Sequence, residues 1–295
     1  MRALIRESRV LKELPSASAV ERVGDFYFVI GDDSANLARF DPEWNFVGST
    51  PLFASAARAG ERIAKMSKPD LEAMCYVEWR GARELLCFGS GSKSPARDVC
   101  YRVDVTNPAL PQNLRFVSLT ALYDTLRANS EIVGAHQLNV EAASCTANTL
   151  ALFQRGNVSG NNVRVEFELD AFMPFLDGSA SLLPTPRVTA FTLPKIKNRL
   201  AGFSAATELD DGIVFAASVE DTDNEIDDGA ALGSFIGMLR GDELVWITPV
   251  EQGNEIAPLK IEGLALTQVR HDSYHLIAVT DDDRGASAIA RIEIS

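Results

Sequence analysis

Lys260-Ile261-Glu262-Gly263-Leu264-Ala265-Leu266 is one copy of a short pattern that recurs along the chain. Asp70-Leu71-Glu72-Ala73-Met74 and Asn139-Val140-Glu141-Ala142-Ala143 are two further copies, in which a glutamate precedes a small residue and then apolar residues. Two related copies, Ser16-Ala17-Ser18-Ala19-Val20 and Gly202-Phe203-Ser204-Ala205-Ala206, carry serine in place of the glutamate. Successive copies are separated by 54, 69, 63 and 58 residues. Such spacing indicates a repeat architecture.

Each copy opens a group of short apolar runs separated by turn signals, a pattern typical of β-strands. The last group has one run too few, whereas residues 3–12 form a lone run before the first group. We therefore predict an all-β fold in one domain, residues 1–295, namely a five-bladed β-propeller with four-stranded blades. The N-terminal strand would complete the last blade and remove the exposed sheet edges. Residues 120–127 show a helical pattern, and a sixth blade hidden in residues 170–186 is the alternative.

Composition limits the kinds of partner. The chain has 295 residues, 46% of them hydrophobic, and a net charge of −13, so it lacks the basic field that attracts nucleic acid or anionic membranes. We find no apolar run of about 18 residues that could span a bilayer and no secretion signal. The cysteines lack CxxC spacing and fit buried free thiols in a cytoplasmic protein; they are Cys75, Cys87, Cys100 and Cys145.

The repeated position predicts a metal site. In a propeller, the first strand of each blade lines the central channel, so Ser18, Glu72, Glu141, Ser204 and Glu262 would meet in a narrow ring. Carboxylates crowded together in such a place have raised pKa values unless a cation lies among them. Oxygen ligands without histidine or cysteine favour Ca²⁺, or Mg²⁺, over Zn²⁺. A solvated ring of glutamates is one alternative, and hydrogen bonding of these side chains to the backbone is another.

Several of these motifs resemble the calcium-activated nucleotidase (soluble apyrase) family. Asn139-Val140-Glu141-Ala142-Ala143-Ser144-Cys145 is similar to its HEAACW cassette, Lys260-Ile261-Glu262-Gly263-Leu264 to its KYEGI cassette, and Gly31-Asp32-Asp33-Ser34 to its VDDRTG loop. The resemblance implies a five-bladed propeller whose tunnel holds Ca²⁺ through residues in the order Ser, Glu, Glu, Ser, Glu. Similar cassettes occur in phytase-like and SdiA-regulated propellers and in uncharacterised bacterial relatives.

The ends of the second strands are expected to surround one mouth of the tunnel. Acidic residues that could hold a metal and basic residues that could hold phosphate occur there together, which suits a phosphate ester or another small anionic ligand. The candidate catalytic residues are Asp32, Asp33, Arg155 and Glu220, and the candidate ligand-binding residues are Lys93, Arg97, Asp221 and Asp282. We expect the acidic stretch 220–228 to form an exposed loop.

Departures from the nucleotidase motifs bear on catalysis. Ser34 stands where that family has an arginine, and Leu152-Phe153-Gln154-Arg155 keeps only one arginine of a Pro-Arg-Arg run. Fewer cations would weaken the charge stabilisation that phosphoryl transfer needs. We therefore expect a calcium-containing propeller that binds a ligand or a protein partner at its mouth, with calcium-dependent hydrolysis of nucleotides or other phosphate esters as the alternative. A glycosidase is the second alternative; it would need paired carboxylates in an aromatic groove.

Overall fold

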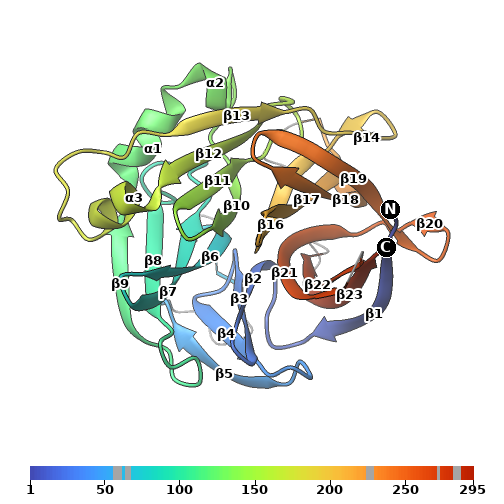
Figure 1. Cartoon of the computed structure of the whole chain (residues 1–295), viewed down its shortest axis with the longest axis horizontal. Coiled ribbons are helices and arrows are strands. Elements are labelled where there is room, and N and C mark those ends of the chain that lie inside the picture. Colours follow the sequence, from blue (N-terminus) through green and yellow to red (C-terminus); the bar gives the residue numbers. More distant parts are fainter. Residues whose placement is uncertain (56–61, 64–67, 224–228, 271–272, 282–286) are drawn as a thin grey trace.

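The computed structural model describes residues 1–55, 62–63, 68–223, 229–270, 273–281 and 287–295. Its strands form sheets arranged around a common centre (Figure 1). Several strands in the interior of the larger sheets are buried over most of their length, as β17 (Gly212–Asp221) is, whereas the outer strand β9 (Gln112–Ser118) is largely exposed. Burial on both faces explains why such strands lack a clean alternation of apolar and polar residues.

Three four-stranded antiparallel sheets follow one another along the chain. The first contains β2 (Ala17–Val23), β3 (Phe26–Gly31), β4 (Asn36–Phe40) and β5 (Phe46–Pro51). The second contains β6 (Leu71–Trp79), β7 (Ala82–Gly89), β8 (Val99–Asp104) and β9. The third contains β10 (Val140–Cys145), β11 (Thr149–Gln154), β12 (Asn162–Glu168) and β13 (Arg187–Phe191).

A nine-stranded sheet contains the two ends of the chain. One half holds β16 (Gly202–Leu209), β17, β18 (Ala230–Arg240) and β19 (Glu243–Gln252), with β20 (Glu255–Ile256) beside β19. The other half holds β21 (Lys260–Arg270), β22 (Ser273–Asp281), β23 (Ser287–Ile294) and β1 (Ala3–Leu11). A short parallel contact, Ala3 with Val250 and Leu4 with Glu251, joins the halves.

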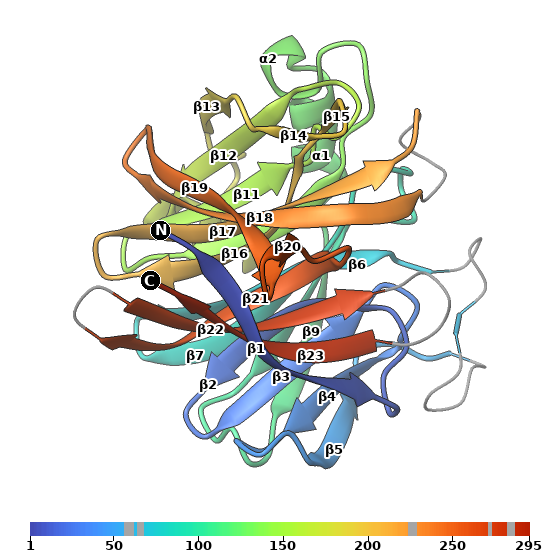
Figure 2. The ribbon, with the colours of Figure 1, turned by 90° about the vertical axis from the view of Figure 1, so that its right-hand side faces the viewer.

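The N-terminal strand completes the C-terminal sheet, as predicted. Strand β1 pairs with β23 along its whole length, and the backbone NH of Arg2 donates to the carbonyl of Ser295 at 2.7 Å. The two chain ends consequently lie side by side (Figure 2). The architecture is that of an all-β, multi-bladed propeller.

Helices occur only in connections between strands of the described chain. The helix α1 (Thr120–Arg127) confirms the prediction for residues 120–127, and with α2 (Ser130–Val133) it covers the junction of the second and third sheets. The helix α3 (Leu169–Leu176) and a loop occupy residues 170–186, so no further sheet is present there. A small hairpin, β14 (Lys195–Ile196) with β15 (Arg199–Leu200), precedes β16.

The core consists of apolar layers between neighbouring sheets, and the largest layer joins the second and third sheets with α1, α2 and α3. All four cysteines are free and buried, which confirms the expectation for the thiols. Within the described parts of the chain, none of the helices combines the length and apolar character needed to cross a bilayer.

Candidate functional site

All five innermost strands carry a β-bulge at the residue that the sequence pattern singles out. The pairing of β2 with β3 skips Ser18, and the pairing of β6 with β7 skips Glu72. The same irregularity falls at Glu141 in β10, Ser204 in β16 and Glu262 in β21. A bulge leaves its extra residue outside the pairing ladder and redirects its side chain. The five positions are therefore structurally equivalent.

The innermost strands surround a small cavity, which we call the tunnel. Its walls include the three pattern glutamates, Glu72, Glu141 and Glu262, together with alanine, glycine and larger apolar residues of all five strands. The cavity volume is about 10 Å³, close to the minimum that holds one water molecule. The structure thus brings the three glutamates to one narrow space.

The two pattern serines are buried on β2 and β16; Ser18 bonds directly to the next innermost strand, whereas Ser204 is linked to it through Ser218. The Ser18 hydroxyl donates to the Leu71 carbonyl at 2.5 Å. Ser204 Oγ lies 3.0 Å from Ser218 Oγ, which donates to the Ile261 carbonyl at 2.9 Å. Since Leu71 and Ile261 directly precede Glu72 and Glu262, these bonds fix the strands that carry two of the glutamates.

Arg155 lies at the centre of a buried charge network, which we call the Arg155 cluster. Its Nη1 atom donates to Glu141 Oε2 at 3.0 Å and lies 4.0 Å from Glu262 Oε1, while its Nη2 atom donates to Glu220. Lys260 Nζ lies 2.9 Å from Glu262 Oε1 and 3.4 Å from Glu220 Oε1. Unpaired charges are rarely buried because desolvation is costly. Mutual pairing offsets part of the cost of burying these five side chains.

A second network, the Lys68 cluster, lies on the side of the first and second sheets. Lys68 Nζ lies 3.0 Å from both Asp33 Oδ1 and Asp70 Oδ1, and it also contacts Asp32. Arg97 pairs with Asp70. These five residues form the cluster, and each acidic member comes from a strand end or an adjoining residue in the first or second sheet. The end of the tunnel between the two clusters is the mouth.

Glu72 lies between the clusters and has no partner among the described residues. Neither a hydrogen bond nor an ion pair to its carboxylate occurs in that part of the chain. Burial raises the pKa of Glu72 well above its ordinary value, and the nearby Glu141, Asp70 and Asp32 raise it further. Oxygens of Asp32, Asp70 and Glu72 lie within 4.8 Å of one another. Among the described residues, the mouth therefore holds one carboxylate without a direct hydrogen bond or ion pair, and the nearby Lys68 only partly offsets the rise in its pKa.

Burial also raises the pKa values of two neighbouring carboxyl groups, those of Glu262 and Asp32. It raises the pKa of Glu262 to about 8, although Lys260 and Arg155 act in the opposite direction. It raises the pKa of Asp32 to about 6 against the effect of Lys68. A cation near the mouth would stabilise the ionised form of both groups.

The candidate residues differ in their burial and in their partners. We expected Glu220 to lie in an exposed loop, and this was wrong. Glu220 lies within β17 and is buried, because its partners Arg155 and Lys260 neutralise its charge. Asp221, the next residue, is exposed and pairs with Arg199 at 2.8 Å. Lys93 is exposed on the loop after β7. Asp282 lies outside the described residues.

Three residues of the clusters were not predicted from the sequence, namely Lys68, Asp70 and Lys260. For two of them a signal exists, because Asp70 and Lys260 stand two positions before the pattern glutamates and residues two apart share a face of a strand. Asn139 holds the equivalent position and donates to Glu141 Oε1 at 2.6 Å. Lys68 belongs to a connection between sheets, where strand periodicity gives no information.

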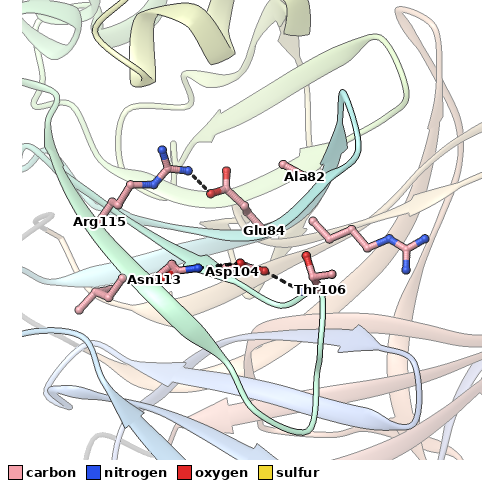
Figure 3. A pocket seen from close by; sticks show the side chains of 8 residues that line it. Ala82, Glu84, Asp104, Thr106, Asn113 and Arg115 are labelled. Atoms are coloured by element: carbon pink, nitrogen blue, oxygen red, sulfur yellow. Dashed lines mark hydrogen bonds and ion pairs between the residues drawn. The ribbon is translucent and has the colours of Figure 1, made fainter.

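An open cleft of about 530 Å³ lies at the outer edge of the second sheet. Figure 3 shows Arg115 directed toward Glu84, and Asp104 between Thr106 and Asn113. Arg102 also holds the buried Glu84, with Nη2 to Oε2 at 2.5 Å. Since these charged groups already satisfy one another, the cleft is a weaker candidate than the mouth.

Comparisons with known proteins identify a family and a fold. The model of a family described as "Family of unknown function (DUF6929)" matches residues 13–294. No sequence among curated proteins matches. Glutaminyl cyclase from Myxococcus xanthus is similar in structure, with a TM-score of 0.50 and 9% identity over 100% of this chain and 99% of that chain. An α-L-arabinanase of Cellvibrio cellulosa gives a TM-score of 0.49 and 11% identity over 94% of this chain and 90% of that chain. At these identities, the likeness to the cyclase concerns the fold alone.

Proposed function

The chain belongs to the family of unknown function DUF6929, and we propose that it is a cation-binding β-propeller that holds Ca²⁺, or Mg²⁺, at the mouth of its tunnel. The observation that carries the proposal is the unpartnered carboxylate of Glu72 beside Glu141, Asp70 and Asp32. A divalent cation would remove this repulsion and would offset the cost of burying the charge.

The charge balance of the mouth supports a cation. The two clusters and Glu72 contain seven carboxylates and four basic side chains. Arg62 and Asp281 add one group of each sign at the rim, where Arg62 Nη1 lies 3.2 Å from Asp33 Oδ2. The mouth therefore carries a net negative charge, which attracts cations and disfavours free anions.

The donor set favours a hard cation. Carboxylate and hydroxyl oxygens, with neither histidine nor cysteine at the five bulges, suit Ca²⁺ or Mg²⁺. We propose Glu72 as the principal ligand, with Glu141 and Glu262 sharing their oxygens between the ion and the Arg155 cluster. Ser18 and Ser204 keep oxygen lone pairs available, and we include them as neutral ligands.

We further propose that the propeller has five blades and forms one domain. The support is the set of five equivalent bulges, one at the start of each inner strand. On this view, the nine-stranded sheet is two four-stranded blades linked by the short parallel contact between β1 and β19.

Binding is favoured over hydrolysis. The resemblance to calcium-activated nucleotidases supports the cation, but a phosphohydrolase also needs basic groups that face the transferred phosphate. Here, Arg155 and Arg97 are already paired with carboxylates. A small anionic ligand or a phosphate ester would therefore be held mainly by the bound cation. A glycosidase gains no support either, because Trp79 contacts Asp170 and Trp44 stacks against Arg291.

Calcium titration tests the proposal. We expect isothermal titration calorimetry to show Ca²⁺ binding and the melting temperature to rise with Ca²⁺, because a ligand at 100 times its Kd stabilises a protein by about 2.7 kcal/mol. Glu72→Gln should abolish both effects, whereas Glu78→Gln, an exposed change on the same strand, should preserve them. Binding heats of zero and equal melting temperatures in Ca²⁺ and in chelator would refute the proposal.

An activity screen separates binding from catalysis. Phosphate release should be absent for a panel of nucleoside diphosphates, nucleoside triphosphates and phosphate monoesters, with Ca²⁺ or without it. Calcium-dependent release that is lost in Glu72→Gln would instead establish the hydrolase alternative.

A further inference from the structure

We propose that the ammonium group of Lys68 is the resident cation of a second position in the mouth, and that it limits the mouth to a single divalent cation. The inference concerns the Lys68 cluster. It rests on the proposed function only in so far as that proposal supplies the single divalent cation bound near Glu72. It assigns to Lys68 the role of setting how many cations the protein takes up.

The ammonium group of Lys68 is surrounded by carboxylates in the way that a bound cation would be. The residue is 9% exposed, and its nitrogen lies 3.0 Å from an oxygen of Asp33 and from an oxygen of Asp70 while also contacting Asp32. An ammonium group has three N–H donors and no acceptor. Three carboxylates around one nitrogen therefore use its full donor capacity.

Two of these carboxylates, Asp32 and Asp70, belong with Glu72 to a group that has the chemistry of a divalent-cation site. Oxygens of Asp32, Asp70 and Glu72 lie within 4.8 Å of one another. Asp32 Oδ1 is buried without a hydrogen-bond partner. Converging carboxylate oxygens are the preferred ligands of Ca²⁺. The acidic group is thus suited to a cation, and the buried lysine shows that a positive charge is held there.

The backbone fixes the lysine in this place. Pro69 follows it and restricts Lys68 to extended conformations. Asp70 adopts a φ of 56°, and its carbonyl accepts a hydrogen bond from the NH of Ser90 at 2.9 Å. Because Lys68 is only two residues from Asp70, the chain keeps its ammonium group close to that carboxylate, at 3.0 Å. A second divalent cation would have to displace a buried charge from this arrangement, which is unfavourable.

Lys68→Met tests the inference, because methionine has a similar length and no charge. Lys68→Arg keeps the charge and serves as the control. The measurement is the number of Ca²⁺ ions per chain, by calorimetry and by metal analysis after gel filtration in Ca²⁺ alone. We expect one ion in the wild type, one in Lys68→Arg and two in Lys68→Met. Equal numbers in the wild type and Lys68→Met would overturn the inference, as would two ions in the wild type.

Loss of the ammonium group could unfold the variant in the absence of Ca²⁺. In that case we expect Ca²⁺ to restore the far-ultraviolet circular dichroism of Lys68→Met, and a variant that stays unfolded in excess Ca²⁺ counts against the inference. The double variant Lys68→Met with Asp70→Asn removes one negative charge as well. It should fold and should bind no more Ca²⁺ than the wild type.

The two proposals fail in different ways. If the wild type binds no ion and Lys68→Met binds one, the proposed function is wrong and the role of Lys68 stands. If both proteins bind one ion, the role of Lys68 is wrong and the proposed function stands.

Discussion

The Arg155 guanidinium donates to Glu141 across 3.0 Å inside the wall of the tunnel, and each of the two residues is less than 10% exposed. Arg155 follows β11 of the third sheet, and its second nitrogen reaches Glu220 in the adjoining half of the nine-stranded sheet. One side chain thereby joins two sheets near the pattern glutamates.

Arg155→Met should be strongly destabilising. The substitution leaves Glu141 and Glu220 buried without their main partner, and breaking a buried ion pair from one side costs about 3–5 kcal/mol. Urea denaturation measures the loss. Arg187→Met is the control, because Arg187 is exposed and pairs with Glu166 at the surface, where about 0–1 kcal/mol is expected. Similar losses in the two variants would contradict a special role for Arg155.

Gly263→Ala should disturb the tunnel wall. A Cβ atom at Gly263 would lie 2.6 Å from the backbone nitrogen of Val20 and 2.6 Å from Val279 Cγ2. Overpacking of this kind costs about 1–3 kcal/mol, because the backbone of β2 has to move. We expect a lower melting temperature and weaker Ca²⁺ binding. Ala73→Gly changes the residue that follows Glu72 and is the comparison, with a loss of about 0.5–1 kcal/mol. If Gly263→Ala left the stability unchanged, the strands would have to be farther apart than the distances to Val20 and Val279 indicate.

Ser218→Ala should weaken the attachment of β17 to β21. The Ser218 hydroxyl lies within 3.0 Å of Ser204 and Ser234 hydroxyl oxygens and donates to the Ile261 carbonyl. Loss of this group leaves buried polar atoms unsatisfied, at a cost of about 1–3 kcal/mol. Chemical denaturation of the variant checks the value. Ser273→Ala removes an exposed hydroxyl and should change the stability by less than about 0.5 kcal/mol. Equal stabilities of both variants would argue against the serine connection.

Glu21 should make the stability depend on pH. Burial raises the pKa of Glu21 to about 8, even though the Tyr76 backbone NH stabilises the charged form, and Glu208 raises it further. Between pH 4.5 and 8 the unfolded chain releases this proton while the folded chain keeps it. The free energy of unfolding should therefore fall as the pH rises through this range, by up to about 1.4 kcal/mol for each pH unit.

Glu21→Gln mimics the protonated acid and should remove this contribution, so that the urea midpoint changes less between pH 5 and 8 than in the wild type. Glu43→Gln, at an exposed site, should keep the wild-type slope. Parallel pH profiles for the wild type and Glu21→Gln would show that Glu21 is ionised in the folded protein.

Much of the fold was predictable because strands and turns produce patterns among residues that are close together in the sequence. The run of residues 3–12, the helix at residues 120–127 and the recurring position of Ser18, Glu72 and Glu262 were all visible in the sequence. Side-chain alternation and turn residues depend on near neighbours in the chain. The burial of Glu220 was not predictable in this way, because the stretch 220–228 is locally acidic and its partner Arg155 is distant in sequence.

The sequence by itself determined the all-β organisation, the pairing of the N-terminal strand with the last sheet, and the five repeated positions, since each follows from periodicity or from a missing run. Only the tertiary structure decided which charges meet. Lys68 with Asp32 and Asp33, or Arg155 with Glu220, are pairs brought together by the packing of separate sheets. Ion pairing depends on separations of a few ångströms and on desolvation, and neither quantity is encoded in the spacing of residues along the chain.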